Sequence, residues 1–311
     1  MTTERTVSPG FLGLPVTGRL DEVSAGTVAV IGVPHGVRYP RQAHDSSGAP
    51  AAIRERSQRF APFIGHHDFD LNGPLAGERT TAAIVDCGDV PDGPSATTAI
   101  AALLDRGAIP VVLGGDDSVP IPVLRAYDGH GPLTVVQVDA HLDFRDEVDG
   151  VRDGYSSPMR RASEMAWVER IVHVGLRGVG SATSGDVADA RAAGNVLITA
   201  REVRRLGIET VFDRLPDDRR WFVALDCDGL DPSVMPAVNA PLPGGLSFDE
   251  VADLLRGLAE RGTIVGMSVT ELVPERDVNG LSAVAATRLV WLLAGAISAS
   301  VSGSSAPIID R

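Results

Sequence analysis

The chain has 311 residues, 44% of them hydrophobic and 22% charged, and these proportions are typical of a water-soluble globular protein. Acidic residues outnumber basic ones by 41 to 28, and the net charge of −13 makes nucleic acid and anionic membranes poor candidate partners. No run approaches the roughly 18 apolar residues that a membrane-spanning helix needs.

Short apolar runs alternate with longer amphipathic segments, which is the pattern of βα units that feed a parallel sheet. The expected strands are 27–33, 82–88, 109–115, 133–139, 170–176, 195–199, 221–226 and 263–269. Apolar residues at helical spacing predict helices over 96–107, 247–262 and 282–298, and Ser247 and Asp249 suit the start of the second. We therefore predict one α/β domain over residues 1–311, with a parallel sheet of about eight strands and helices on both faces.

The chain has only two cysteines, Cys87 and Cys227, and each lies inside or beside an apolar run. A disulfide framework is therefore not expected, and a reducing compartment fits. The N-terminal stretch MTTERTVSPGFLGLP lacks a charged leader followed by an apolar segment. We expect a cytoplasmic protein.

Acidic side chains gather at the ends of four expected strands. They are Asp116 and Asp117; Asp139, His141 and Asp143 in DAHLD; Asp226, Asp228 and Asp231 in DCDGLD; and Glu271 and Asp277. In parallel α/β sheets, ligands bind at the carboxyl ends of the strands. The residues just after the apolar runs are therefore where we expect the chemistry.

Two of these motifs predict a metal site. Because alternate residues of an extended chain point to the same side, Asp139, His141 and Asp143 should converge, as should Asp226 and Asp228. Clustered carboxylates would repel one another in a partly dry crevice, so we expect one or more cations between them.

Other polar residues near the strand ends have simpler interpretations. A single aspartate after a strand is usually a turn or helix-capping residue, and we expect that role for Asp86, Asp89, Asp116 and Asp231. His173 lies in the middle of the run IVHVG, where a hydrogen-bonded core histidine is expected. We assign no histidine other than His141 to the metal.

Several motifs, in one order along most of the chain, resemble the arginase and agmatinase family of ureohydrolases, and the agmatinase branch more closely. They are GAPAAIRERS (48–57), DCGDVP (86–91), GGDDS (114–118), DAHLD (139–143), SSPMRR (156–161), LDCDGLDP (225–232), APLPGGLS (240–247) and TELVPERD (270–277). The resemblance implies a three-layer α/β/α fold, and a homo-oligomer that is a trimer or a hexamer.

The resemblance also implies a crevice with two divalent ions, usually Mn²⁺, that are bridged by a hydroxide. By position, five of the family's six ligands match Asp139, His141, Asp143, Asp226 and Asp228. Asp139 and Asp228, or their neighbours, are expected to bridge the ions, and Asp143 also to orient the hydroxide. Glu271 matches the residue that holds a guanidinium group in the family, so the expected reaction releases urea and an amine.

The chain departs from the family at two positions. The family has histidine where this chain has Asp117, and we favour Asp117 as the sixth ligand over an outward-turned side chain with one ion lost, because a carboxylate oxygen reaches about as far as the near imidazole nitrogen. Aligned on Pro158 and Arg160, the histidine that shuttles protons to the leaving amine falls at Tyr155. A tyrosine, with an unperturbed pKa near 10, is a poorer shuttle at neutral pH.

Three hypotheses for the function follow. The first is an amidinohydrolase acting on agmatine or another small guanidino or amidino compound. The second is an enzyme of the same fold that hydrolyses a different C–N bond, such as that of a formimino group. The third is a catalytically silent subunit of a mixed oligomer. The charged loop 144–155 follows the agmatinase branch more than the arginase branch, which makes free arginine the less favoured substrate.

Overall fold

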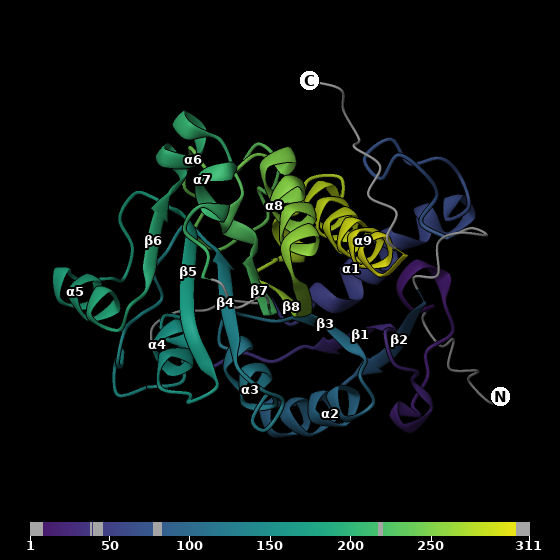
Figure 1. Cartoon of the computed structure of the whole chain (residues 1–311), viewed down its shortest axis with the longest axis horizontal. Helices are drawn as coiled ribbons and strands as arrows, with labels where there is room; N and C mark the ends of the chain where they lie inside the picture. The colour runs from purple at the N-terminus through teal and green to yellow at the C-terminus, as the bar shows by residue number, and fades with distance from the viewer. Residues whose placement is uncertain (1–8, 38, 40–45, 77–82, 217–219, 303–311) are drawn as a thin grey trace.

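The computed structural model describes residues 9–37, 39, 46–76, 83–216 and 220–302. One sheet of eight parallel strands runs through it in the order β2-β1-β3-β8-β7-β4-β5-β6 (Figure 1). The strands are β1 Val28–Val33, β2 Ile84–Asp89, β3 Ile109–Gly114, β4 Leu133–Val138, β5 Val168–Leu176, β6 Val196–Thr199, β7 Arg220–Asp226 and β8 Thr263–Thr270. All eight predicted strands are confirmed, with bounds that differ by no more than two residues.

The sheet is apolar on both faces, which explains why its strands read as continuous apolar runs. In β1, Val28 and Val30 belong to one core cluster, whereas Ile31 and Val33 belong to the cluster on the opposite face. Each cluster continues across the neighbouring strands and into the helices that cover that face. This confirms the predicted three-layer α/β/α arrangement.

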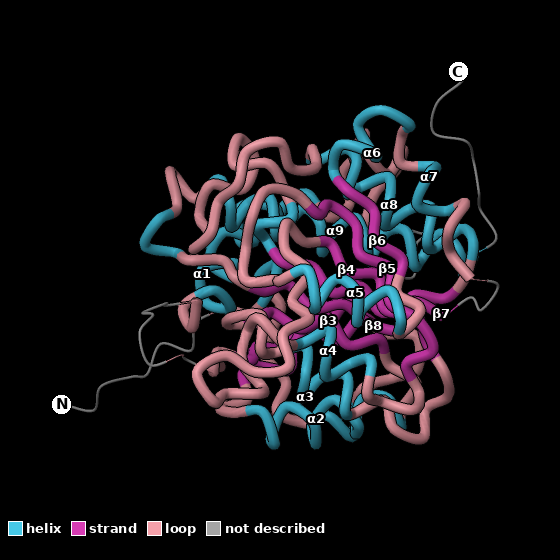
Figure 2. The backbone as a smooth tube through the Cα atoms, turned by 90° about the vertical axis from the view of Figure 1, so that its left-hand side faces the viewer, coloured by secondary structure: helices cyan, strands magenta, loops and turns pink. Residues whose placement is uncertain are grey.

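Helices cover both faces of the sheet. They are α1 Ala49–Ser57, α2 Gly93–Asp105, α3 Pro120–Arg125, α4 Pro158–Ser163, α5 Ser184–Ala192, α6 Ala200–Leu206, α7 Glu209–Phe212, α8 Phe248–Arg261 and α9 Leu281–Ser302. Short 3-10 helices are η1 Phe11–Gly13, η2 Leu20–Glu22, η3 Gln58–Phe63, η4 Cys227–Gly229 and η5 Pro274–Arg276. Helix α9 packs against α1 and α8 on one face, and α3 packs against α2 and α4 on the other; Figure 2 shows the strands enclosed between the helices.

The three predicted helices are present as α2, α8 and α9. Helix α8 begins where expected, because the Ser247 side chain accepts a hydrogen bond from the Glu250 N–H and the Glu250 side chain accepts one from the Ser247 N–H. Helix α2 begins three residues before the predicted position 96, since Asp92 caps its N-terminus by accepting from the Ser95 N–H.

Helix α9 contains a long apolar stretch, contrary to the expectation that no such stretch is present. Its stretch Leu281–Ser300 has a mean hydropathy of 1.6 and is, by length and composition, apolar enough to cross a membrane. The search for uninterrupted runs missed it because Thr287 and Arg288 lie in the middle. In the structure 78% of this stretch is buried, so the core of the protein accounts for its apolar composition.

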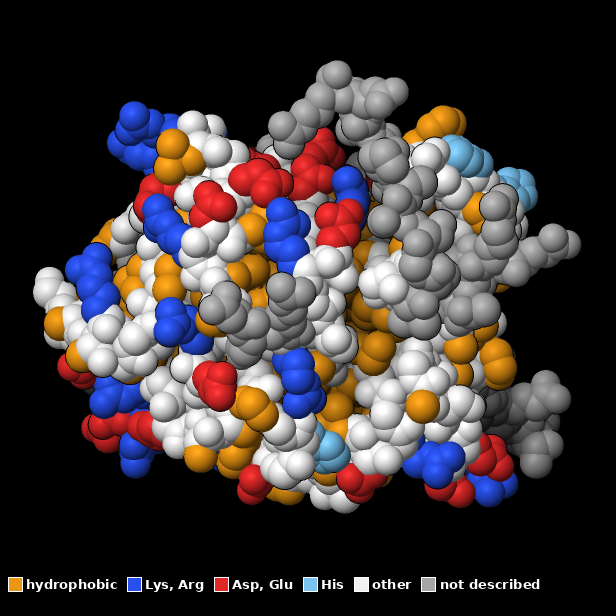
Figure 3. All heavy atoms as spheres, viewed as in Figure 1, with side chains coloured by type: hydrophobic (Ala, Val, Ile, Leu, Met, Phe, Trp, Pro, Cys, Tyr) orange, Lys and Arg blue, Asp and Glu red, His pale blue; other side chains and the backbone are white. Residues whose placement is uncertain are grey.

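Charged side chains are mixed on the surface of the face shown in Figure 3. Arginines lie among acidic and apolar side chains there and do not gather into one continuous basic field. Ion pairs are consistent with this mixing, as in the pairs of Arg214 with Glu202 and Arg261 with Glu209.

The strand order places four strand ends side by side. Strands β3, β8, β7 and β4, whose ends carry the clustered acidic residues, are consecutive neighbours in the middle of the sheet. Strands β3 and β4 follow each other in sequence but are separated in the sheet by β8 and β7. In parallel sheets, a switch point of this kind leaves a crevice at the carboxyl ends of the strands. The fold therefore delivers all the acidic motifs to one crevice.

Candidate metal centre

Two groups of side chains in the described part of the chain could each hold a cation. One group is Asp117, Asp139, Asp143 and Asp226, and the other is Asp139, His141 and Asp228. Within each group the potential ligand atoms lie within 4.8 Å of one another. The crevice therefore brings together all six residues that the sequence predicted as ligands, and Asp139 is shared by the two groups.

The aspartates that follow β4 and β7 are held by tight turns. The His141 N–H donates to Asp139 Oδ1 over 2.6 Å, and the Asp228 N–H donates to Asp226 Oδ1 over 2.7 Å. The predicted convergence is therefore present, but it arises from side-chain-to-backbone turns after the strand ends and not from alternation along an extended strand. These bonds fix each carboxylate relative to its own backbone.

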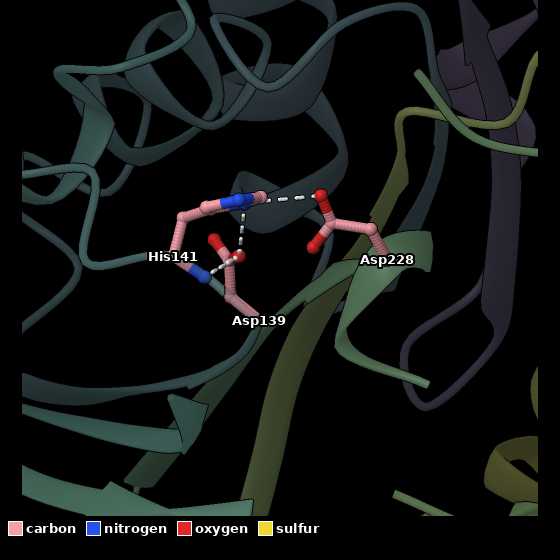
Figure 4. A group of neighbouring side chains, drawn as sticks. All are labelled: Asp139, His141 and Asp228. Carbon is pink, nitrogen blue, oxygen red and sulfur yellow. Dashed lines mark hydrogen bonds and ion pairs between the residues drawn. The ribbon is translucent and has the colours of Figure 1, made fainter. Parts of the chain in front are cut away.

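His141 lies between two carboxylates, as Figure 4 shows. Its Nδ1 is 3.0 Å from Asp228 Oδ2 and 3.5 Å from Asp139 Oδ1. Burial lowers the pKa of His141, but the hydrogen bonds and negative charges of the two aspartates outweigh it and raise the pKa to about 11. The same carboxylates that attract a proton to this nitrogen would attract a metal cation to it.

Asp117 points into the crevice and is almost fully buried. Its Oδ1 accepts a 2.7 Å hydrogen bond from Thr270 Oγ1, whereas its buried Oδ2 has no hydrogen-bond partner among the residues that the structure describes. Burial first, and then the charge of Asp139, raise the pKa of Asp117 well above its usual range. A buried carboxylate oxygen without a partner, beside three other carboxylates, fits a cation that prefers oxygen ligands.

Two non-glycine residues of the crevice have left-handed backbone conformations. Asp143 has a φ of 45° and Glu271 a φ of 65°, values that side-chain-bearing residues rarely adopt. Neighbouring bonds hold both in place, from the Met159 N–H to the Asp143 carbonyl and from the Glu271 N–H to the Gly115 carbonyl. Strained conformations of this kind cluster at functional sites.

Glu271 lies beside the cluster without belonging to either group. Its Oε1 accepts a 2.9 Å hydrogen bond from the Asp117 N–H, and its Oε2 is 3.4 Å from Asn239 Nδ2. Burial, and after it the charge of Asp116, raises the pKa of Glu271 to about 8. Nearby positive charge, such as that of a substrate cation, would favour the ionised form of Glu271, and a carboxylate at the edge of the crevice is suited to bind the cationic end of a substrate.

Tyr155 also borders the crevice. Its ring packs against Tyr39 with a centroid distance of 4.4 Å, and the Tyr39 hydroxyl accepts a hydrogen bond from the Ser156 N–H. Burial, then Tyr39 and the negative charge of Glu271, raises the pKa of Tyr155 above its ordinary value. The phenol is therefore neutral at physiological pH and can donate a hydrogen bond.

The residues predicted to have local structural roles divide into two kinds. Asp116 accepts hydrogen bonds from the N–H and hydroxyl of Ser118, and Asp231 accepts from three backbone N–H groups, so both are turn residues as expected. Asp86 also has the expected turn bond, from the Gly88 N–H to its Oδ1, but it pairs in addition with the guanidinium of Arg54, as Asp89 does. The spacing of residues in the sequence does not reveal the contacts of Arg54 with these two aspartates, because it is α1 that brings Arg54 to the end of β2.

Comparison with known proteins identifies the family. A family model described as the arginase family matches residues 26–295. The chain belongs to the arginase family. The mitochondrial arginase of Medicago truncatula is 31% identical over 304 residues, covering 88% of this chain and 83% of that protein. Guanidinopropionase of Pseudomonas aeruginosa is 32% identical over 322 residues and covers 92% of both proteins. The solved structure of proclavaminate amidinohydrolase from Streptomyces clavuligerus matches with a TM-score of 0.77 and 27% identity, covering 94% of this chain and 97% of that one.

Membership in the arginase family makes the protein a hydrolase of amidino carbon–nitrogen bonds. Three side chains of this arginase-family crevice were missed by the sequence analysis, namely Gln137, Asn239 and Thr270. Gln137 was detectable as the one amide in the apolar run LTVVQV, two residues before Asp139. Thr270 and Asn239 carry no comparable signal, because their contacts with Asp117 and Glu271 depend on the order of the strands.

Proposed function

We propose that this protein hydrolyses the guanidino C–N bond of a small cationic substrate with the help of two divalent cations. The proposed ligands are Asp117, Asp139, His141, Asp143, Asp226 and Asp228. The observation that carries the proposal is the pair of ligand groups that share Asp139. A second support is the carboxylate of Glu271, which is hydrogen-bonded to the backbone of Asp117 at the edge of the same crevice.

The charge of the crevice suits a guanidinium group. Glu271 would bind its N–H groups through a charge-assisted pair of hydrogen bonds, and this contact would aim the central carbon at the attacking water. The buried carboxylate of Asp143 would accept a hydrogen bond from that water and orient it. Because a guanidinium carbon is a poor electrophile, alignment of this kind is a large part of the catalytic task.

The proposed reaction consumes one water molecule. When bound, the two cations would lower the pKa of a water between them toward about 7 and so supply a nucleophile at neutral pH. The water oxygen forms a bond to the guanidinium carbon, and the bond from that carbon to the substituted nitrogen breaks. Both protons of the water end on the leaving nitrogen; the hydroxyl of Tyr155 is the proposed donor of one and regains its proton from the water, and the products are urea and a protonated amine.

The identity of the metal is proposed from the types of its ligand atoms, and the identity of the substrate from the related proteins. Five carboxylates and one imidazole favour a hard divalent ion, and we propose Mn²⁺. Relatives named agmatinase and guanidinopropionase support a guanidino substrate, such as agmatine or a guanidino acid. The substitution of Asp117 and Tyr155 for the family's histidines supports a substrate other than free arginine.

We also propose a cytoplasmic homo-oligomer, a trimer or a hexamer. The cytoplasmic location is supported by Cys87 and Cys227, which are both free thiols. The oligomer rests on the family resemblance. Size-exclusion chromatography with light scattering is the measurement for it, and a purely monomeric protein would contradict it.

The proposed activity is tested by urea release. Purified protein loaded with Mn²⁺ is incubated with agmatine, 3-guanidinopropionate, arginine and a formimino compound, and urea and formamide are measured separately. Urea from a guanidino compound, lost in Asp139→Ala, is the expected result. Formamide from the formimino compound alone would replace the proposed reaction with the second hypothesis, and no product from any compound would favour a silent subunit.

A further inference from the structure

A series of buried, hydrogen-bonded polar side chains extends from the candidate metal centre along the sheet. Gln137 Nε2 donates a 2.5 Å hydrogen bond to Asp139 Oδ2, and Gln137 Oε1 is hydrogen-bonded to His173 Nδ1. The other ring nitrogen of His173 is 3.2 Å from Asn195 Nδ2. All four side chains are buried, and they extend from the shared aspartate, across β5, to the residue before β6.

Strand register brings these residues together. Gln137 of β4 and His173 of β5 are direct partners in the parallel ladder, so their side chains project from the same face of the sheet. Gln137 is two residues before Asp139, at the end of the same strand. The amide is therefore placed between the aspartate and the histidine by the sheet itself.

The donors and acceptors in this series of hydrogen bonds can be arranged in only one way. The amide nitrogen of Gln137 faces Oδ2 of Asp139 and donates to it, so the amide oxygen faces His173 and accepts. His173 must then carry its proton on Nδ1. Burial lowers the pKa of His173 to about 3, which keeps the ring neutral and leaves Nε2 to accept from Asn195. Every donor thus points toward the shared carboxylate.

We propose that Gln137 and His173 are positioning residues that fix the shared carboxylate of Asp139 for two cations. This inference rests on the proposed metal centre. The protein already donates one hydrogen bond to each oxygen of Asp139, from the His141 N–H to Oδ1 and from Gln137 to Oδ2. These two bonds fix the orientation of the carboxylate, and each oxygen retains a further lone pair that would be available to a cation.

Partners that orient a ligand from outside the metal's own coordination sphere commonly change metal affinity by about 10- to 100-fold. His173 acts one step further away, by holding the Gln137 amide in the orientation that donates to Asp139. Loss of its Nδ1 donor would free this amide to rotate and present its oxygen to a carboxylate. Both residues should therefore affect metal binding although neither is itself a ligand.

The test compares Mn²⁺ affinity by calorimetry, and the electron paramagnetic resonance spectrum of the bound ions, in five full-length proteins. Gln137→Met keeps the volume and removes the donor; His173→Leu removes the Nδ1 donor; His173→Asn restores a donor at that position. Ser268→Ala is the matched control, since it removes a buried hydroxyl on β8 that has no hydrogen-bond partner within the described residues. Wild type is the reference.

We expect Mn²⁺ to bind about 10- to 100-fold more weakly to Gln137→Met, and more weakly to His173→Leu than to His173→Asn. The control should bind like the wild type. If neither Gln137→Met nor His173→Leu changes the affinity and the spectrum, the positioning role is overturned. Should Gln137→Met not fold, the comparison of the two His173 variants decides in the same way. A wild type that binds no Mn²⁺ would overturn the metal centre and this inference together, whereas binding without urea release would overturn only the proposed reaction.

Discussion

The backbone N–H of Asp117 donates a 2.9 Å hydrogen bond to Oε1 of Glu271, at the ends of the neighbouring strands β3 and β8. This bond joins a proposed cation ligand to the residue proposed to bind the substrate. It involves the backbone of Asp117, so it survives any change of that side chain. The position of Glu271 and the ligand properties of Asp117 can therefore be altered separately.

Replacing Glu271 with glutamine tests the substrate contact. In Glu271→Gln the amide oxygen can still accept from the Asp117 N–H, so the fold and the bound Mn²⁺ should be retained. Removing the negative charge from a buried contact with a cation should lower kcat/KM by about 100-fold or more. The control is Glu275→Gln, an exposed glutamate on the same loop. A Glu271→Gln enzyme with most of its activity would refute the guanidinium assignment.

The centre of the sheet was predictable because buried parallel strands are continuous apolar runs. Segments such as Ile109–Gly114 and Leu133–Val138 appear in the sequence almost as the structure has them. The order of the strands was not predictable, since nothing in β7 or β8 indicates that they lie between β3 and β4. The shortest helices were also missed; α7 has four residues, too few to show a helical period.

The proposed metal ligands were predictable because their spacing is local. Asp139, His141 and Asp143 lie within five residues, and any tight backbone path after a strand brings them together. Contacts between distant segments were not predictable in this way. The 2.7 Å bond from Thr270 to Asp117 joins residues 153 positions apart, and only the pairing of β3 with β8 creates it.

Metal stoichiometry should distinguish the shared ligand from the others. Manganese-loaded wild type should contain close to two ions per chain by elemental analysis. Asp139→Ala should lose both, because Asp139 belongs to both groups, whereas His141→Ala should lose one. One ion or none in wild type at saturating Mn²⁺ would contradict the binuclear centre, and equal losses in the two variants would contradict the shared role of Asp139.

Metal-free protein should become more stable as the pH falls from about 8 to about 6.5. Burial, and then the charge of Asp116, raises the pKa of Glu271 from 4.5 to about 8. Burial lowers the pKa of His141, but its hydrogen bonds to Asp139 and Asp228 outweigh burial and raise the pKa from 6.5 to about 11. In this window the folded state binds more protons than the unfolded chain, so acidification stabilises it, by several degrees in Tm.

Thermal unfolding in the presence of EDTA measures this dependence, and the manganese-loaded protein is the comparison. Protons compete with the cation for the same ligands, so the loaded protein should lose stability over the same fall in pH. Below about pH 6.5 the stabilisation of the metal-free protein should continue, because burial raises the pKa of Asp116 and Asp139 to about 6; His173, whose pKa burial lowers to about 3, partly offsets it. Parallel curves with and without Mn²⁺ would contradict the assigned cluster.

Variants at Tyr155 test the proton donor. Because burial raises its pKa, Tyr155 can donate a hydrogen bond at neutral pH but is a weak acid. Tyr155→Phe should lower kcat by about tenfold or more, and Tyr155→His, with an ordinary pKa of about 6.5, should exceed wild type near neutral pH. The pH profile of kcat measures both effects. A phenylalanine variant as active as wild type would remove Tyr155 from the chemistry.

Asp117 should give the enzyme an alkaline pH optimum. A carboxylate ligand adds one negative charge that the family's histidine does not have, and this charge opposes deprotonation of the attacking water. The atom expected to exert the effect is Oδ2 of Asp117, which is buried and has no hydrogen-bond partner in the described part of the chain. The same charge should favour hard ions such as manganese over nickel or zinc.

Replacing Asp117 with histidine should therefore shift the pH profile of kcat toward lower pH, at saturating Mn²⁺, and raise activity near neutrality where the imidazole fits beside Thr270. The control is Thr270→Val, which removes the 2.7 Å hydrogen bond to Asp117 Oδ1 without changing the charge of any ligand. It should move the profile much less than Asp117→His does. An unchanged or upward-shifted kinetic pKa in Asp117→His, with both ions present by elemental analysis, would contradict ligation by Asp117, because a side chain outside the ligand set has little influence on the attacking water.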